Sequence, residues 1–343
     1  MDIGERGFTR LASKLLSRRW LCKRLPPGDD ASCIELGPGT LIVKIDGGSV
    51  ERMRLPWMTW GDVGWKSVVA TASDIIAKGG RPLAFLLSIG LPPETRVEDA
   101  LSIVEGAYEA AERIGAWLAG GDTNASREAW VDVAGVGVAI REPIGVNARP
   151  GDLVYTTVGR YGLTGLAFRI LAEEGGEGIE SYPEALRATR RPEPRLGFLE
   201  LVEKLPGCIT WASDVSDGFC ATLKRLEELT GYTVILERLP SLHREALEYA
   251  GDKGVSIEEL LVGGGEEYEI VFSVKRSCET MLNRAADAAG ITIERIGFVV
   301  HLPREPDIRT PVEGGIKGPM RIKFIKLEEL CVRTGWDQFR GWV

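Results

Sequence analysis

Short apolar segments bounded by glycine and proline alternate along this chain between helical and strand periodicity. Residues 64–80 and 97–115 carry apolar side chains at helical spacing, and both segments end in glycine. Residues 40–46, 82–92 and 130–140 are shorter and rich in β-branched or other apolar residues, which predicts strands. The alternation predicts a mixed α/β fold (α+β).

A turn-rich segment at residues 141–152 interrupts this pattern. The second half then restarts with an apolar strand and a helix, and predicted strands and helices continue to about residue 300. The 343 residues are enough for two domains of ordinary size. We therefore expect one domain at 1–145 and a second domain at 146–343.

The composition argues against several classes of partner. A net charge of −8 is unlike the basic surface of a general nucleic-acid binder. No apolar run approaches the roughly 18 residues that cross a bilayer, and the N-terminus lacks the apolar core of a signal peptide. We expect a cytoplasmic protein that binds neither nucleic acid nor membranes.

Cysteine and histidine usage argues against a structural zinc site. The six cysteines form no C-x-x-C pair, and the chain has two histidines. In a chain without a signal peptide, we expect the cysteines to be reduced and mostly buried. The chain also contains only three Asn and one Gln, which is typical of thermophilic proteins.

Acidic residues at the ends of the expected elements are the main functional signal. Each alone has a structural explanation, because Asp bonds to nearby backbone in turns and caps helices, which contributes about 1 kcal/mol. Asp74 is the exception, since its neighbours in VVATASDIIA would bury it and an unpaired buried carboxylate is costly. The acidic residues that stand out are Asp29, Asp30, Asp46, Asp74, Asp122, Asp214, Asp217, Glu266 and Glu267.

Together these carboxylates predict a metal-dependent phosphoryl-transfer site. Carboxylate oxygens bind Mg²⁺, which bridges them to substrate phosphates. In AGGDTNAS (119–126), glycines would let backbone amides approach a phosphate, and we expect a helix N-terminus to follow. The chain has no G-x-x-x-x-G-K-[ST], H-R-D or D-F-G motif, so it is neither a P-loop protein nor a protein kinase.

Several motifs, taken in order, resemble those of thiamine-monophosphate kinases, a family of the aminoimidazole ribonucleotide synthase-like (PurM-like) superfamily. The resemblance runs from about residue 26 to about residue 300. The motifs at 73–92 and 213–218 are specific to the superfamily. The motifs are GDDAS (28–32), ID (45–46), SDIIAKGGRPLAFLLSIGLP (73–92), GGDT (120–123), SDVSDG (213–218) and GGGEEYEIVF (263–272).

The resemblance implies a two-domain PurM-like protomer. The N-terminal domains would pair in a homodimer, and the active site would lie in the cleft between the domains. The implied reaction transfers the γ-phosphate of ATP to thiamine monophosphate, with Mg²⁺ as cofactor, and gives thiamine diphosphate and ADP.

The resemblance also implies roles for particular residues. We expect Asp122 and Asp217 to be catalytic, and Glu266 and Trp336 to contact the acceptor. The nucleotide phosphates would be bound by Gly120, Gly121, Asp122, Thr123, Ser216 and Asp217. The metal-binding aspartates of the family match Asp29, Asp30, Asp46, Asp74, Asp122 and Asp214.

Three departures from the family pattern lie mainly on the acceptor side. After Asp46 the family usually has V-E-G-V-H-F, where this chain has GGSVERMRLPW. Glu267 stands where the family has Asp, and Gln338 stands where it has His. The aromatic Trp336 is retained and is suited to stacking on a heteroaromatic ring. Two alternatives therefore stay open: another ATP-dependent enzyme of the superfamily with a different small-molecule acceptor, or a non-catalytic nucleotide-binding member.

Overall fold

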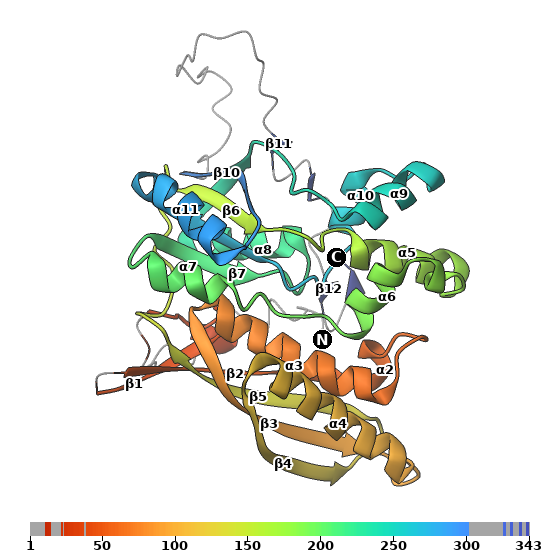
Figure 1. The fold of residues 1–343 in the computed structure, drawn as a ribbon. Coiled ribbons are helices and arrows are strands. Elements are labelled where there is room, and N and C mark those ends of the chain that lie inside the picture. Colours follow the sequence, from red (N-terminus) through yellow and green to blue (C-terminus); the bar gives the residue numbers. More distant parts are fainter. Residues whose placement is uncertain are drawn as a thin grey trace.

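The computed structural model describes residues 11–14, 22, 24–37, 39–301, 325–326, 330–331, 336–337 and 341–342. These residues form two lobes, each built on its own β-sheet, and we call residues 24–139 the first lobe and residues 153–301 the second lobe (Figure 1). Two sheets with helices packed on them confirm the expected mixed α/β fold class. None of the helices in the described ranges is long and apolar enough to cross a membrane.

The first lobe is built on a five-stranded sheet. Its strands are β1 (Ser32–Leu36), β2 (Gly39–Ser49), β3 (Gly80–Leu91), β4 (Trp117–Ala125) and β5 (Trp130–Ala139). Its helices are α2 (Val50–Met53), α3 (Trp60–Ala77) and α4 (Val97–Ile114). The strand order is β1-β2-β5-β3-β4, and only β3 and β4 are parallel, because α4 connects them as a crossover.

Helix α3 lies between the first sheet and the second lobe (Figure 1). It begins with a capping box between Thr59 and Asp62, which explains why the helix starts earlier than the predicted residue 64. Nearly all of its side chains are buried, because the sheet covers one side and α4 and the second lobe cover the rest. The helix therefore carries Asp74, and Lys78 just beyond its end, into the interface between the lobes.

The other face of the first sheet is open. In β3, Phe85 and Leu87 are buried beneath the helices, whereas Leu86 points the opposite way and is 49% exposed. Leu83 lies at a bulge in the strand and is 48% exposed. Within the described part of the chain nothing covers these side chains. Further exposed apolar residues of the same sheet are Ile34, Leu36, Ile45, Trp117 and Val138.

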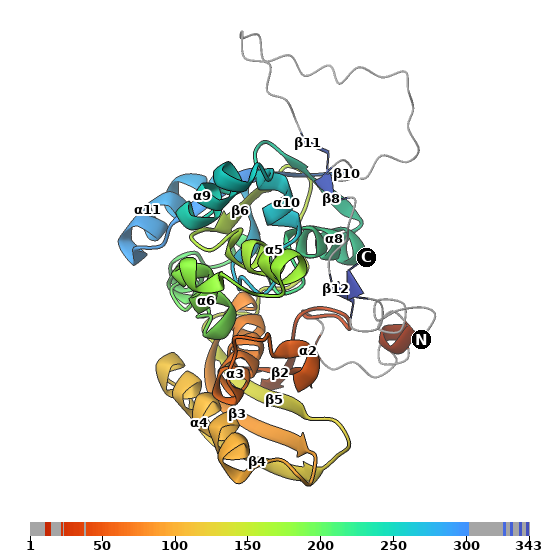
Figure 2. The same ribbon diagram turned by 90° about the vertical axis from the view of Figure 1, so that its right-hand side faces the viewer.

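The second lobe lies above the first in Figure 2 and is built on a six-stranded sheet. Its strands are β6 (Leu153–Thr157), β7 (Ile209–Asp214), β8 (Tyr232–Leu236), β9 (Ile270–Val274), β10 (Ile293–His301) and β11 (Ile325–Lys326), in the order β11-β8-β10-β6-β9-β7. Its helices are α5 (Leu163–Glu174), α6 (Pro183–Arg190), α7 (Phe198–Lys204), α8 (Phe219–Thr230), α9 (Arg244–Lys253), α10 (Ile257–Val262) and α11 (Glu279–Ala289).

The two faces of the second sheet belong to two different cores. Trp211 and Ala212 are neighbours in β7, yet Ala212 packs in the core shared with the first lobe and Trp211 packs in the outer core. Helices α7 and α11 belong to the shared core, whereas α5, α8, α9 and α10 belong to the outer one. Strand β7 is therefore buried on both sides and places its last residue, Asp214, at the interface between the lobes.

All six cysteines are paired in disulfides, so the expectation that they are reduced is wrong. The pairs are Cys22–Cys33, Cys208–Cys278 and Cys220–Cys331, with Cα–Cα distances of 5.2, 5.9 and 5.6 Å. All six side chains are buried, as expected. Pairing over 11, 70 and 111 residues depends on the tertiary fold and not on local spacing. Disulfides inside cells are a known feature of hyperthermophiles.

Candidate functional site

Asp30, Asp74 and Asp214 lie together between the lobes, and all three are buried. Each offers a carboxylate oxygen, and these oxygens lie within 4.8 Å of one another. Asp30 comes from the turn before β1, Asp74 from the last turn of α3 and Asp214 from the end of β7. The structure thus brings together three of the six residues that we expected to bind metals, and we call these three the acidic cluster.

Lys78 is buried beside this cluster. Its ammonium group contacts Asp29, lies 3.2 Å from Asp30 Oδ2 and donates to the carbonyl oxygen of Ala212 at 2.6 Å. Lys78 therefore links Asp29 to Asp30 of the acidic cluster through its contacts with both carboxylates.

Lys44 connects the cluster to Asp46. The Nζ atom of Lys44 lies 2.6 Å from Asp74 Oδ2 and 3.4 Å from Asp46 Oδ2. Asp46 is partly exposed, whereas Asp74 is buried. Asp46 therefore lies at the open side of the acidic cluster.

Arg225 of α8 connects the cluster to Asp217. Its guanidinium group contacts Asp30 and lies 3.5 Å from Asp217 Oδ2. Asp217 follows β7 in the loop that leads into α8. Asp214 and Asp217 stand three residues apart in the sequence but differ in burial. Asp214 is buried in the cluster, whereas Asp217 is partly exposed at its edge.

The sequence reasoning did not identify the three cations Lys44, Lys78 and Arg225. Lys78 follows Asp74 by four residues, a spacing that places two side chains on one helix face. Lys44 and Asp46 are two residues apart in a strand, which also places them on one face. Arg225 carries no such signal, because its partners lie in other elements.

Negative charge at the cluster is not fully offset. Burial, together with the charge of Asp30, raises the pKa of Asp214 to about 7. Burial also raises the pKa of Asp74 well above its ordinary value. Burial acts in the same direction on Asp30, but Lys78 and Arg225 outweigh it and hold the pKa of Asp30 at about 2. The positive charge near Asp74 and Asp214 therefore does not offset the effect of their burial.

A divalent cation fits this arrangement. The Oδ2 atom of Asp214 is buried and accepts no hydrogen bond from the residues that the structure describes. Hard cations such as Mg²⁺ bind carboxylate oxygens, and a bound cation would offset the charge that raises these pKa values. Asp30, Asp74 and Asp214 are the residues that could hold it.

The loop after β7 lies against the loop before β9. The backbone N–H of Glu266 donates to Ser216 O at 2.7 Å, and that of Tyr268 donates to Val215 O at 3.0 Å. Glu266 and Tyr268 have φ values of 62° and 50°, a conformation that is costly for residues other than glycine and that recurs at functional sites. The hydroxyl of Ser216 also donates to Asp214 Oδ1 at 3.2 Å. The two loops therefore form one edge of the site.

Asp217 and Glu266 reach the surface of this edge. Their side chains are 42% and 29% exposed, and Glu266 pairs with Lys66 at 2.5 Å. The next residue, Glu267, is buried, and its Oε1 accepts a hydrogen bond from Thr164 at 2.7 Å. Burial raises the pKa of Glu267 to about 8. A substrate could reach Asp217 and Glu266 but not Glu267.

Asp122 lies apart from the acidic cluster, on the edge strand β4. In the sheet, Asp122 lies opposite Ser88 of β3, and Ser88 lies opposite Asp132 of β5. Asp132 in turn lies opposite Gly47 of β2, the residue after Asp46. Three strand spacings, about 14 Å, therefore separate Asp122 from β2. Its carboxylate is exposed and accepts a hydrogen bond from a neighbouring Asn at 2.9 Å. The structure does not bring Asp122 to the cluster within one chain, and its catalytic and metal-binding roles stay predictions.

The helix expected after residues 119–126 is wrong, because β4 leads to another strand, β5. Gly121 is needed for strand packing, since a Cβ there would lie 1.8 Å from Leu87 O in β3. Gly120 and Thr123 lie on the same exposed strand. Their predicted contact with nucleotide phosphates therefore has no helix N-terminus to support it and stays a prediction.

Trp336 belongs to a short strand, β12 (Trp336–Asp337), that pairs with β13 (Gly341–Trp342). Its side chain, and all of Gln338, lie outside the described residues. The predicted contact of Trp336 with the acceptor thus stays a prediction.

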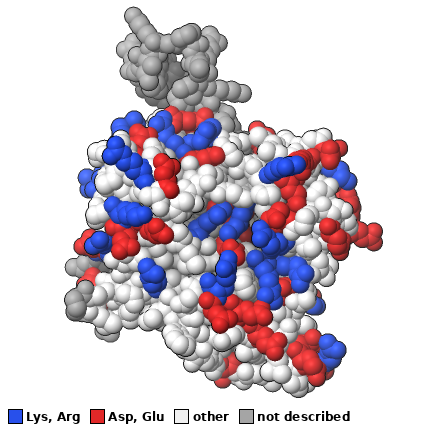
Figure 3. Space-filling model, in the orientation of Figure 1, with Lys and Arg blue, Asp and Glu red and all other residues white. Residues whose placement is uncertain are grey.

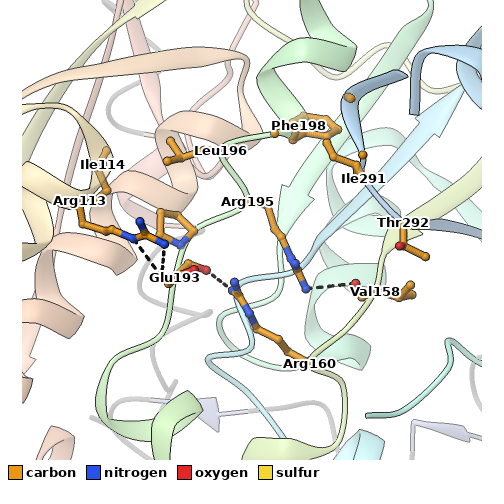
Figure 4. A pocket seen from close by; sticks show the side chains of 14 residues that line it. Arg113, Ile114, Val158, Arg160, Glu193, Arg195, Leu196, Phe198, Ile291 and Thr292 are labelled. Atoms are coloured by element: carbon orange, nitrogen blue, oxygen red, sulfur yellow. Dashed lines mark hydrogen bonds and ion pairs between the residues drawn. The ribbon is translucent and has the colours of Figure 1, made fainter. Parts of the chain in front are cut away.

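A separate cavity of about 460 Å³ lies between the lobes and is lined by arginines (Figure 4). Arg113 of the first lobe pairs with Glu193 at 2.9 Å, and Arg195 donates to the buried Glu269 at 2.6 Å. Basic side chains gather in the middle of the face seen in Figure 3, with acidic side chains beside them. No residue of the acidic cluster lines this cavity. Arg113 and Arg195 are already paired with carboxylates, and the guanidinium group of Arg160 donates to the backbone carbonyl of Glu193.

The fold and the acidic cluster define the class of protein. Residues 28–139, which contain the whole first sheet, match the family model of the AIR synthase related protein, N-terminal domain. The chain is therefore built on the PurM-like fold.

Three known proteins narrow this class. The thiamine-monophosphate kinase of Pyrobaculum calidifontis is 33% identical over 340 residues, which are 99% of this chain and 97% of the relative. The crystal structure of tt0281 from Thermus thermophilus has a TM-score of 0.80 and 36% identity, over 88% of this chain and 95% of that one. The structure of AaThiL complexed with AMPPCP and TMP has a TM-score of 0.74 and 25% identity, over 88% and 92%. The chain belongs to the thiamine-monophosphate kinase family.

Proposed function

We propose that this protein transfers the γ-phosphate of ATP to thiamine monophosphate and forms thiamine diphosphate and ADP. The observation that carries the proposal is the convergence of Asp30, Asp74 and Asp214 at the lobe interface of a chain from this family. The similar AaThiL is known in complex with AMPPCP and TMP, which supports an ATP-like donor and this acceptor.

Asp30, Asp74 and Asp214 would hold Mg²⁺, with Asp46 at the open side as a further candidate ligand. When bound, Mg²⁺ neutralises the negative charge of the phosphates and aligns them. Asp30 and Asp74 are held in place by Lys44, Lys78 and Arg225, and Asp214 accepts a hydrogen bond from Ser216, so the chain prepares the site before substrates arrive.

The edge formed by the loops after β7 and before β9 would position the acceptor. Asp217 stands directly before the N-terminus of α8, where unpaired backbone N–H groups favour a phosphate. Ser216 and Glu266 lie on the same edge. We assign no strong general base, because the second pKa of a phosphate monoester is about 6 and the acceptor is already ionised at neutral pH.

We propose a homodimer in which a second copy covers the open face of the first sheet. Leu83 and Leu86, with the other exposed apolar residues of that sheet, form the kind of surface that marks a protein interface. Asp122 lies on the edge strand of the same sheet, so dimerisation would change its surroundings. We place the protein in the cytoplasm, where ATP is available, with no nucleic-acid or membrane partner.

The test is ADP release from ATP and Mg²⁺ with thiamine monophosphate, compared with thiamine and with small-molecule phosphate acceptors of other PurM-like enzymes. We expect release to be stimulated by thiamine monophosphate alone, with thiamine diphosphate as the product. Stimulation by a different acceptor would keep the nucleotide half of the proposal and overturn the acceptor. Binding of ATP without turnover on any acceptor would favour a non-catalytic member.

A further inference from the structure

We propose that Lys78 is a permanent cation of the phosphoryl-transfer site, and that Asp29 binds this ammonium group instead of a divalent cation. The inference deepens the proposed function, since it rests on the divalent-cation site at Asp30, Asp74 and Asp214. It concerns the number of cations that the site takes from solution.

The surroundings of Lys78 are those of a bound cation. The Lys78 side chain has no exposed surface, and its backbone lies directly after the C-terminal end of α3. An ammonium group has three N–H donors, and Lys78 has three oxygen neighbours: a carboxylate oxygen of Asp29, one of Asp30 and the carbonyl of Ala212. The nitrogen is thus held among three oxygens from segments of both lobes.

Both lysine and arginine side chains contact the carboxylates on the side of Lys78. Asp29 and Asp30 face two cations, Lys78 and Arg225. On the other side of Asp30, Lys44 is shared between Asp74 and Asp46. Arg225 also lies near, but its ion pairs are with Asp30 and Asp217, and Asp214 has no ion pair among the described residues. Among the described residues, the carboxylate oxygens that converge within 4.8 Å belong to Asp30, Asp74 and Asp214, and Asp29 is not among them. We therefore place the divalent cation beside Asp74 and Asp214, and the ammonium group of Lys78 beside Asp29.

Replacement of Lys78 by Met tests whether the lysine takes the place of a divalent cation beside Asp29, because it removes the charge and keeps much of the side-chain volume. Asp29 and Asp30 would then be buried side by side with one fewer cation, which is unfavourable unless an ion binds. We expect K78M to bind about one more Mn²⁺ per chain than the wild type, counted from the free Mn²⁺ signal in electron paramagnetic resonance. The full chain is used without nucleotide or acceptor, so the count does not depend on whether the proposed reaction occurs.

Two controls separate this effect from a general loss of charge or of stability. Lys66 is also buried in α3 but pairs with Glu266 outside the cluster, so K66M should keep the wild-type Mn²⁺ count. K78R keeps the positive charge and should also keep the wild-type count. Equal counts in folded K78M and wild type, or a gain in K66M as large as that in K78M, would overturn the proposal.

A second variant keeps the proposal falsifiable if K78M does not fold. D29N removes the carboxylate that we assign to Lys78 and leaves Asp30, Asp74 and Asp214 unchanged. Its Mn²⁺ affinity should stay within about twofold of the wild type, whereas D30N should lose at least about tenfold, the scale of effects near metal sites. A loss in D29N as large as that in D30N would make Asp29 a metal ligand and contradict the inference.

Discussion

Asp214 should contribute to the pH dependence of the stability of the metal-free protein, together with Glu267, whose raised pKa of about 8 acts in the same direction. The pKa of Asp214 is about 7 in the folded chain and its ordinary value is 3.8. Between these two values the folded state holds a proton that the unfolded state has lost, so stability decreases as the pH rises through this window. We expect the Tm of the metal-free protein to increase by several degrees when the pH is lowered from about 8 to about 6.

Mg²⁺ and the D214N variant serve as controls for this pH dependence. Mg²⁺ stabilises the ionised carboxylate and should reduce the increase in Tm. D214N has no proton to bind at this position and should also show a smaller increase. A Tm that falls between about pH 8 and about pH 6 without metal would contradict the electrostatic account of the cluster.

Asp122 allows a second test at the scale of a single residue. Its side chain is exposed and its only described hydrogen bond is with Asn124, so D122A should change the free energy of unfolding by less than about 0.5 kcal/mol. If Asp122 has its predicted catalytic role, turnover should nevertheless be lost. Steady-state kinetics and thermal unfolding of the same preparation measure both effects. Retained turnover would remove Asp122 from the active site.

Two disulfides allow a prediction at the scale of single elements. Cys22–Cys33 closes the turn that carries Asp30, whereas Cys208–Cys278 lies at the end of β7 that is remote from Asp214. In the chain-entropy account, the 11-residue separation stabilises by about 3 kcal/mol and the 70-residue separation by about 4 kcal/mol.

Serine replacement of the two cysteine pairs should therefore affect different properties of the protein. Loss of Cys22–Cys33 should loosen the turn and weaken Mg²⁺ binding, while loss of Cys208–Cys278 should lower the Tm more and leave Mg²⁺ binding unchanged. Titration of Tm with Mg²⁺ for both double variants measures the two effects together. Equal Mg²⁺ affinity in the two variants would show that the first disulfide does not position Asp30.

Helices and strands can be predicted well where the local sequence pattern determines them. The helix expected at 97–115 is observed at Val97–Ile114, and the strand expected at 82–92 is observed at Gly80–Leu91. The helix expected after residues 119–126 is wrong, because this segment pairs with β3 as a strand and leads to another strand, β5. Local preference is weakest where a strand depends on its neighbours.

The candidate site was predictable only in part for a similar reason. The sequence marks Asp30, Asp74 and Asp214 by their position beside glycine or serine, or within an apolar run. It does not reveal that Arg225 neutralises Asp30, or that Cys220 pairs with Cys331, since these contacts join residues about a hundred or more positions apart. Such pairs are set by the tertiary packing of the chain.

The open face of the first sheet leads to a prediction for the whole molecule. We expect the protein to be a dimer in solution and L86E to be a monomer with an unchanged fold, because Leu86 is 49% exposed in the single chain. M281E is the matched control, since Met281 is 46% exposed on α11 in the other lobe. Light scattering after size-exclusion chromatography measures the mass. A dimeric L86E, or a monomeric wild type, would exclude this face as the interface.

The most direct test of the account is the formation of thiamine diphosphate from ATP and thiamine monophosphate by D214N beside the wild type, with and without Mg²⁺. D252N serves as a control, because Asp252 is an exposed residue of α9. We predict Mg²⁺-dependent product from the wild type and from D252N, and a loss of at least about 100-fold in D214N, the upper end of effects at metal sites. Undiminished product from folded D214N, or product that needs no divalent cation, would contradict a phosphoryl-transfer site at the acidic cluster.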